Sequence, residues 1–213
     1  MFKIIINCIL LLFLSNGYAY NVFLADNSER EAHYKQNTEA IKPECIKRMA
    51  AFDVGSAATR MKVADVNVCE KIVVKVISEV KKKIDYGEEL LTHENKEFGP
   101  AIMDKGLTEL KLLVEEANAL KAQVLVGVAT HAFREAKNAP AFVSRIISET
   151  KIDLKIISWK QEAILGCMGV IAKGKSDLKK IAVWDIGAGS VELTFFSEKF
   201  NAFFNEMASI SFR

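Results

Sequence analysis

A strand–turn–strand pattern occurs twice in the chain, about 130 residues apart. In each copy an aspartate stands near the end of an apolar strand, and a turn of small residues follows: Asp53-Val54-Gly55-Ser56 and Asp185-Ile186-Gly187-Ala188-Gly189-Ser190. Such turns expose backbone N–H groups that can hold phosphate oxygens. The aspartate can hold a divalent cation against the same phosphates. Either copy alone is typical of an ordinary hairpin, but the repetition favours a two-sided phosphate site.

The sequence between the two copies alternates between strand and helix periodicity. Apolar or alternating runs predict strands over residues 49–54, 61–66, 72–80, 123–129, 153–158, 181–186 and 191–196. Apolar spacing of three or four predicts helices over residues 99–119, 140–150 and 161–171, the second with Asn138 as its cap and Pro140 in its first turn. This order predicts an α/β fold rather than a sandwich or a helical bundle.

The first nineteen residues have the features of a secretory signal peptide. Lys3 supplies a positive charge, residues 4–14 are nearly all apolar, and Gly17 and Ala19 are small residues before the expected cleavage site. An uncleaved anchor is the alternative, but eleven apolar residues are too few to span a bilayer core of about 30 Å. We therefore expect a periplasmic or secreted protein with no stable membrane anchor after cleavage.

Composition excludes two further classes of protein. Apolar residues make up 50% of the 213-residue chain, and 29 Lys and Arg nearly balance 27 Asp and Glu. This much apolar content excludes disorder, and the balanced charge excludes a strongly basic module that binds a nucleic acid duplex.

Three cysteines remain after the expected cleavage, which permits one disulfide and leaves one thiol. Cys45 and Cys69 flank the first hairpin, so they are the candidate pair. Cys167 lies in an apolar helical run and is expected to be buried and inert.

Two other segments have phosphate-binding character. Residues 169–176 match the pattern GxxxxGKS, but they end a predicted helix and precede a strand, whereas a phosphate loop follows a strand and opens a helix. Gly174 is therefore interpreted as a helix-ending turn. Residues 81–83 are three lysines, either a solvated strand end or a cationic rim that attracts polyanions.

The chain resembles the exopolyphosphatase/guanosine pentaphosphate phosphatase (Ppx/GppA) family of the actin-like ATPase superfamily. The resemblance covers residues 50 to about 195 and rests on segments in family order: 51–56 with Arg60, 129–138, 156–163, 169–170 and 185–193. It implies actin-like (ribonuclease H-like) lobes with a mixed five-stranded sheet and helices.

The resemblance also implies an Mg²⁺-dependent hydrolase that removes terminal phosphate from polyphosphate or a nucleoside polyphosphate. Its implied roles are Asp53 and Asp185 for the metal and Glu162 as base, with Arg134 neutralising the phosphates or the loop around them. The implied phosphate-binding residues are Gly55, Ser56, Gly187, Gly189 and Ser190. Arg134 is alternatively a structural arginine that pairs with Glu135 or a helix end.

Several departures from the family pattern favour a catalytically degenerate protein that binds phosphate, polyphosphate or a nucleotide. Ala57 and Ala58 replace polar residues of the first turn, and Ala188 replaces a glycine of the second. If position 188 requires positive φ, alanine costs on the order of 1 kcal/mol. Gln161-Glu162 replaces a pair of glutamates, so the base is lost if it belongs at the first position and kept if it belongs at the second. A structural partner with an empty cleft is a third alternative.

The domain organisation expected from these motifs is asymmetric. Residues 1–19 form the signal peptide, 20–47 a leader, 48–172 a first lobe, and 173–213 the truncated start of a second lobe. Self-association into a homodimer is one way to cover the exposed edge of such a chain.

Overall fold

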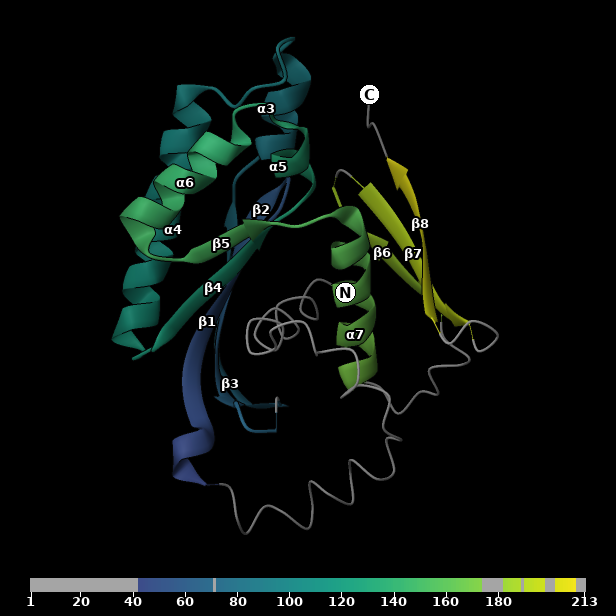
Figure 1. The fold of residues 1–213 in the computed structure, drawn as a ribbon. Helices are drawn as coiled ribbons and strands as arrows, with labels where there is room; N and C mark the ends of the chain where they lie inside the picture. The colour runs from purple at the N-terminus through teal and green to yellow at the C-terminus, as the bar shows by residue number, and fades with distance from the viewer. Residues whose placement is uncertain (1–41, 71, 174–181, 189, 198–201, 210–213) are drawn as a thin grey trace.

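The computed structural model describes residues 42–70, 72–173, 182–188, 190–197 and 202–209 (Figure 1). The predicted signal peptide, nearly all of the predicted leader and Gly174 of the GxxxxGKS pattern lie outside the described residues. The preceding part of that pattern is helical up to Lys173, as predicted.

A mixed five-stranded sheet forms the centre of the first lobe. Its strands are β1 (Ile46–Val54), β2 (Ala58–Asn67), β3 (Ile72–Lys83), β4 (Val124–Ala129) and β5 (Asp153–Ile156), in the order β3-β2-β1-β4-β5. The β1–β2 and β2–β3 pairs are antiparallel, whereas β1–β4 and β4–β5 are parallel. The predicted α/β class and mixed five-stranded sheet are confirmed.

Four helices, α3 (Tyr86–Thr92), α4 (Pro100–Ala119), α5 (His131–Glu135) and α6 (Ala139–Thr150), lie on one side of this sheet (Figure 1). Four aromatic rings from α3, α5, α6 and the loop before α4 form one cluster with centroids 5.0–6.3 Å apart: Tyr86, Phe98, Phe133 and Phe142. Helices α3 and α5 were not predicted, because seven and five residues are too few to show a helical period.

The cap predicted for α6 is only half right. Asn138 occupies the N-cap position and Pro140 lies in the first turn, but the Asn138 side chain makes no capping hydrogen bond. Its amide instead accepts from the Phe98 N–H and donates to the Phe98 carbonyl, both at 2.9 Å. Asn138 therefore ties the start of α6 to the loop before α4.

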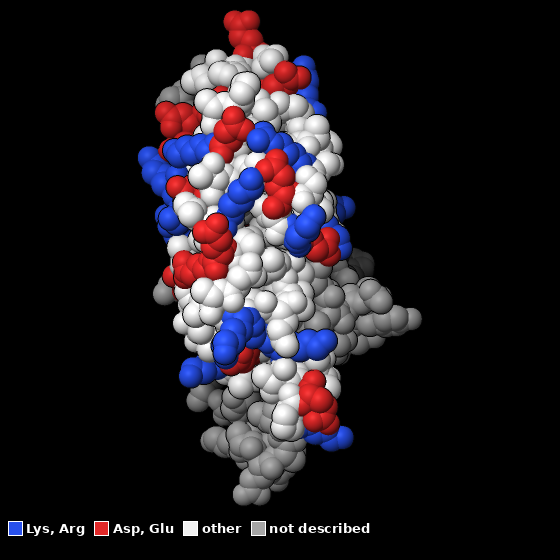
Figure 2. Space-filling model, turned by 90° about the vertical axis from the view of Figure 1, so that its left-hand side faces the viewer, with Lys and Arg blue, Asp and Glu red and all other residues white. Residues whose placement is uncertain are grey.

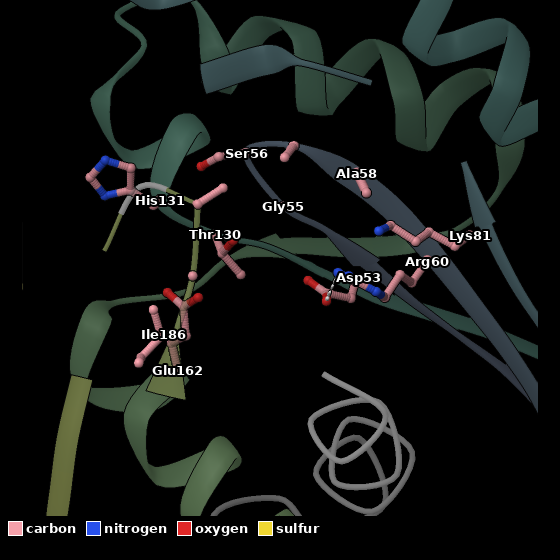
Figure 3. A pocket seen from close by; sticks show the side chains of 13 residues that line it. Asp53, Gly55, Ser56, Ala58, Arg60, Lys81, Thr130, His131, Glu162 and Ile186 are labelled. Carbon is pink, nitrogen blue, oxygen red and sulfur yellow. Dashed lines mark ion pairs between the residues drawn. The ribbon is translucent and has the colours of Figure 1, made fainter. Parts of the chain in front are cut away.

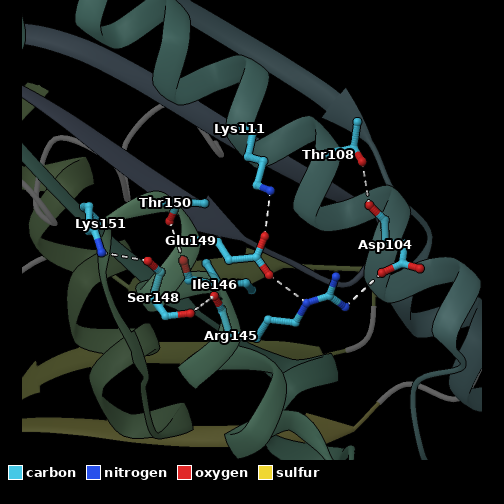
Figure 4. Close-up of polar contacts among 9 residues, drawn as sticks. All are labelled: Asp104, Thr108, Lys111, Arg145, Ile146, Ser148, Glu149, Thr150 and Lys151. Carbon is cyan, nitrogen blue, oxygen red and sulfur yellow. Dashed lines mark hydrogen bonds and ion pairs between the residues drawn. The ribbon is translucent and has the colours of Figure 1, made fainter.

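Ion pairs connect the outer surfaces of α4 and α6 (Figure 4). Arg145 donates to Asp104 at 2.8 Å and to Glu149 at 2.9 Å, and Lys111 donates to Glu149 at 2.6 Å. Figure 2 shows acidic and basic side chains interspersed on the side of the molecule it presents. The pairs are exposed and screened by solvent, so they add little to stability.

The opposite face of the first sheet packs against α7 (Trp159–Lys173). Leu165 of α7 belongs to a buried cluster with Met49 and Val128. A second, antiparallel sheet of β6 (Ala182–Ile186), β7 (Ser190–Ser197) and β8 (Ala202–Ser209) lies on the far side of α7 (Figure 1). Among the described residues, no helix has the length and apolar content of a membrane span.

A disulfide joins Cys45 to Cys69, as the sequence suggested. Cys45 ends a 3₁₀ turn over Pro43–Cys45, and its carbonyl accepts from the Val68 N–H at 2.8 Å. These contacts extend the fold a few residues into the segment expected to be a loose leader. Cys167 is buried and free, which confirms the expectation for that residue.

Candidate active site

A pocket of about 280 Å³ lies where the ends of β1 and β4 meet the start of α7 and the turn after β6 (Figure 3). Strands β1 and β4 are parallel neighbours, with Val54 opposite Ala129, so the residues that follow both strands lie at one edge of the sheet. The pocket is lined by five of the predicted site residues: Asp53, Gly55, Ser56, Glu162 and Gly187.

The first turn presents two backbone donors to the pocket. The Gly55 N–H is already used, because it donates to the Ala58 carbonyl at 3.0 Å. Within the described part of the chain, the next two N–H groups, of Ser56 and Ala57, have no acceptor. Both residues line the pocket, and the Ser56 carbonyl is fixed by the Gly87 N–H at 2.8 Å. This turn can therefore hold an anion through Ser56 and Ala57 rather than through the Gly55 amide.

The second turn also lines the pocket, through Gly187 and Ala188. Among the described non-glycine residues only three lysines, at positions 96, 121 and 151, have positive φ. Alanine at position 188 therefore carries no left-handed strain, and the cost considered from the sequence does not arise. Gly189 lies outside the described residues, and Ser190 begins β7.

Asp53 is a buried carboxylate in the floor of the pocket. Its side chain lies 3.9 Å from the Arg60 guanidinium, and the residue is only 4% exposed. Burial raises the pKa of Asp53 to about 7; the Arg60 charge opposes that rise, and the Glu162 and Asp185 carboxylates add to it. Asp53 therefore belongs to a group of three carboxylates that repel one another and lack a full complement of positive charge.

Asp185 lies behind the pocket, against α7. A Cβ at Gly166 would meet Asp185 Oδ2 at 2.9 Å, so the absence of a side chain at this position lets α7 approach β6. Burial raises the pKa of Asp185, and its Oδ1 is buried without a hydrogen-bond partner among the described residues. An unpartnered buried carboxylate oxygen is a position that a cation or its bound water satisfies.

The donor set fits magnesium held jointly with a phosphate. Among the described residues no three His, Cys, Asp or Glu side chains are close enough to enclose a metal. Magnesium is usually held by only one or two carboxylates, with water and substrate phosphates completing its shell. Asp53, which lines the pocket, and Asp185, which lies behind it, could provide such a partial set.

Glu162 enters the pocket from the first turn of α7, and Arg134 holds it. Arg134 Nη1 donates to Glu162 Oε2 at 2.7 Å and to the Ile157 carbonyl at 3.1 Å. Burial raises the pKa of Glu162, while the Arg134 charge opposes the rise. Arg134 is not among the lining residues, and its hydrogen bond to Glu162 gives it a positioning role; that it neutralises the phosphates or the loop around them stays a prediction. Its alternative partner, Glu135, pairs with Lys96 instead.

Gln161 caps the start of α7. Its side-chain oxygen accepts from the Ser158 N–H at 2.9 Å, and its own N–H donates to Ser158 Oγ at 3.3 Å. This reciprocal pair is a capping box, in which glutamine and glutamate are interchangeable. Gln161 is not among the residues that line the pocket, whereas Glu162 is.

The lining also includes polar residues to which the sequence analysis gave no site role, among them Arg60, Thr130 and His131. The signal for Thr130 is its place directly after buried β4, equivalent to the turn after β1. Thr130 helps to lower the pKa of Glu162 against the larger effect of burial, and burial lowers the pKa of neighbouring His131. The signal for Arg60 is strand register, because Arg60 on β2 lies opposite Asp53 on β1. Lys81 also lines the pocket, which favours the cationic-rim interpretation for the first of the three lysines.

The Ppx/GppA phosphatase family model matches residues 63–206, more than half of the chain. The chain belongs to this family. The match includes Thr130, Glu162 and the second turn, and the actin-like fold expected from the sequence is confirmed.

The relatives that match this chain are longer than it is, and the chain covers only part of each. The crystal structure of the Aquifex aeolicus Ppx/GppA family member has a TM-score of 0.64 and 25% identity, over 78% of this chain and 51% of that one. An exopolyphosphatase from Cytophaga hutchinsonii shares the fold, with a TM-score of 0.64 and 21% identity over 77% and 51%. A bifunctional 3-dehydroquinate synthase/phosphatase of Fusobacterium nucleatum is 26% identical over 83% of this chain and 28% of that protein. The chain thus spans about half the length of these solved relatives.

Proposed function

We propose that this protein is an exported, magnesium-dependent phosphoanhydride hydrolase that releases the terminal phosphate of polyphosphate or a nucleoside polyphosphate. The observation that carries the proposal is the convergence of Glu162, Asp53 and the two open N–H groups of the first turn on one pocket.

Each of these groups has a task in hydrolysis. The Ser56 and Ala57 N–H groups and the Arg60 guanidinium bind phosphate oxygens. Glu162 accepts a proton from the attacking water, while the bond from the terminal phosphorus to the bridging oxygen breaks. A raised pKa brings a carboxylate closer to neutral pH, where general bases work best. Arg134 keeps the Glu162 carboxylate in place.

Asp53 and Asp185 would hold the metal, which neutralises charge that develops on the phosphate oxygens. Their burial and the unpartnered Oδ1 of Asp185 support this assignment. Export is supported by the apolar segment 4–14 and by the Cys45–Cys69 disulfide, because disulfides persist chiefly in oxidising compartments.

A phosphate-release screen tests the proposal. Purified protein is incubated with polyphosphates of several lengths and with nucleoside polyphosphates, with magnesium and with excess chelator. We expect orthophosphate release that requires magnesium. No release from any of these substrates in the presence of magnesium would contradict it.

One observation favours a binding protein as the second candidate. Ala57 and Ala58 line the pocket and offer no side-chain donor to phosphate. Under that alternative, calorimetry detects tight binding of polyphosphate or a nucleotide while no turnover occurs.

A further inference from the structure

Three consecutive lysines at the end of β3 have three different surroundings. Lys82 Nζ lies 3.1 Å from Glu109 of α4, and Lys83 Nζ lies 3.3 Å from Asp85. Lys81 alone lines the pocket, and no carboxylate among the described residues pairs with it. Lys81 is also solvent-exposed, so its ammonium group is available to a ligand.

Strand register places Lys81 beside the other cation of the pocket. Lys81 pairs with Arg60 across the β2–β3 ladder. Side chains alternate between the faces of a strand, so Lys81 shares the pocket side of the sheet while Lys82 points toward α4. Figure 3 shows Lys81 and Arg60 on one side of the pocket and Glu162 with Ile186 on the other, with Asp53 between them.

The two sides of the pocket therefore differ in chemistry. Bond cleavage requires the terminal phosphate to lie within reach of a water held by Glu162. Asp53 offsets part of the Arg60 charge at 3.9 Å, but Lys81 has no such carboxylate neighbour in the described structure. An ammonium group is a point charge that binds phosphate without a fixed geometry.

We propose that Lys81 binds a phosphate group behind the terminal one, so that the site selects linear phosphate chains over orthophosphate. The inference rests on the proposed function, which places the terminal phosphate beside Glu162. It makes Lys81 a specificity residue that acts on substrate binding rather than on bond cleavage.

Calorimetry on the full chain with magnesium tests this assignment, with orthophosphate and tripolyphosphate as ligands. Lys81→Met should weaken tripolyphosphate binding about tenfold, as expected for the loss of one charge-assisted hydrogen bond, and leave orthophosphate binding unchanged. Lys81→Arg should restore most of the affinity. Lys83→Met is the matched control: it removes the same charge two residues away, outside the pocket lining, and should bind both ligands like the parent protein.

Two results would overturn the assignment: unchanged tripolyphosphate affinity in Lys81→Met, or equal losses in Lys81→Met and Lys83→Met, which would indicate general charge attraction. A separate measurement of phosphate release distinguishes the two proposals. If the protein releases no phosphate but Lys81→Met still weakens tripolyphosphate binding, only the proposed hydrolase function is contradicted. If Lys81→Met hydrolyses the substrate like the parent protein and with an unchanged KM, only the role proposed for Lys81 is contradicted.

Discussion

The carboxylates of Asp53, Glu162 and Asp185 interact in and behind the pocket, and Asp53 is the most deeply buried of the three residues. Asp53 is 4% exposed, and Glu162 and Asp185 are near enough to raise its pKa. A buried charge without full compensation costs stability, and sites kept for binding often carry such a cost.

Asp53→Asn should therefore stabilise the metal-free protein while it abolishes activity. Asparagine keeps the shape and removes the charge, and we expect the melting temperature to rise by roughly 5 °C, at about 2–4 °C per kcal/mol. Asp65→Asn is the control, because Asp65 accepts two hydrogen bonds from Arg48 at 2.8 and 3.0 Å and its substitution should lower stability. A lower melting temperature for Asp53→Asn would show that its charge is compensated in the free protein.

His131 provides a pH-dependent contribution to stability. Burial, assisted by the Arg134 charge, lowers the pKa of His131, while Glu135 opposes the shift. The unfolded chain therefore binds a proton more readily than the folded one. The stability from His131 is complete above the ordinary pKa of about 6.5 and is lost as pH falls below it.

The measurement is a comparison of unfolding free energies of the parent protein and His131→Gln between pH 7.5 and 5. Relative to the variant, the parent should lose stability as the pH falls. A constant difference across that range would contradict the assignment.

Residue roles were the hardest part to predict from sequence. Asp53 was identified from the repeated aspartate–glycine turn, and Glu162 because its segment matches a family pattern. The task of Arg134 depends on which of two neighbouring partners it contacts, and that follows from the path of the chain after β5. The sequence did not distinguish positions 161 and 162 as the proposed base; in the structure Gln161 lies in the helix cap and Glu162 lines the pocket.

At the scale of elements, Gly106 sets the position of α4 over the core. A Cβ at this position would overlap the Tyr86 hydroxyl and lie 2.8 Å from Tyr86 Cζ. Tyr86 is fully buried in the aromatic cluster with Phe133, whose helix α5 directly follows Thr130 of the pocket.

Gly106→Ala should destabilise the protein by about 1–3 kcal/mol, although alanine is the better helix former. Chemical denaturation measures the change, and Lys105→Ala on the exposed side of α4 should stay within about 0.5 kcal/mol of the parent. Tyr86→Phe removes the overlapping oxygen and should recover part of the loss in the double variant. A neutral Gly106→Ala would contradict this close packing.

Elements with a clear period were predictable, and short ones were not. The alternation in β3 and the spacing of Leu107 and Leu110 in α4 located both elements. Helices α3 and α5 depend on the packing of Tyr86 and Phe133 in the aromatic cluster, which local sequence does not encode.

At the scale of the whole molecule, the disulfide ties the start of the fold to the turn after β2. It joins residues 24 apart, and in the loop-entropy model closing such a loop contributes about 3 kcal/mol. The double variant Cys45→Ser/Cys69→Ser should lose about this much. Reductant should destabilise the parent protein to the level of the double variant and leave that variant unchanged; a parent insensitive to reductant would contradict the prediction.

The pocket itself combines parts that are far apart in the sequence. Asp53 and Thr130 are brought together by the parallel β1–β4 pair, and Glu162 and Gly187 are added by α7 and the turn after β6. The repeated aspartate–glycine turns predicted that two turns meet across a site. They did not predict that the second turn reaches the pocket together with helix α7, which contributes Glu162.

The most direct test of this account compares phosphate release from tripolyphosphate, with magnesium, by Glu162→Gln and Gln161→Ala. Glu162 is the proposed base, so Glu162→Gln should lower kcat about 10²–10⁴-fold with little change in tripolyphosphate affinity. Gln161→Ala removes only the capping box and should lower the melting temperature while kcat stays close to that of the parent. A Glu162→Gln variant with parental kcat, or a Gln161→Ala variant that folds and is inactive, would contradict the assignment of catalysis to this pocket.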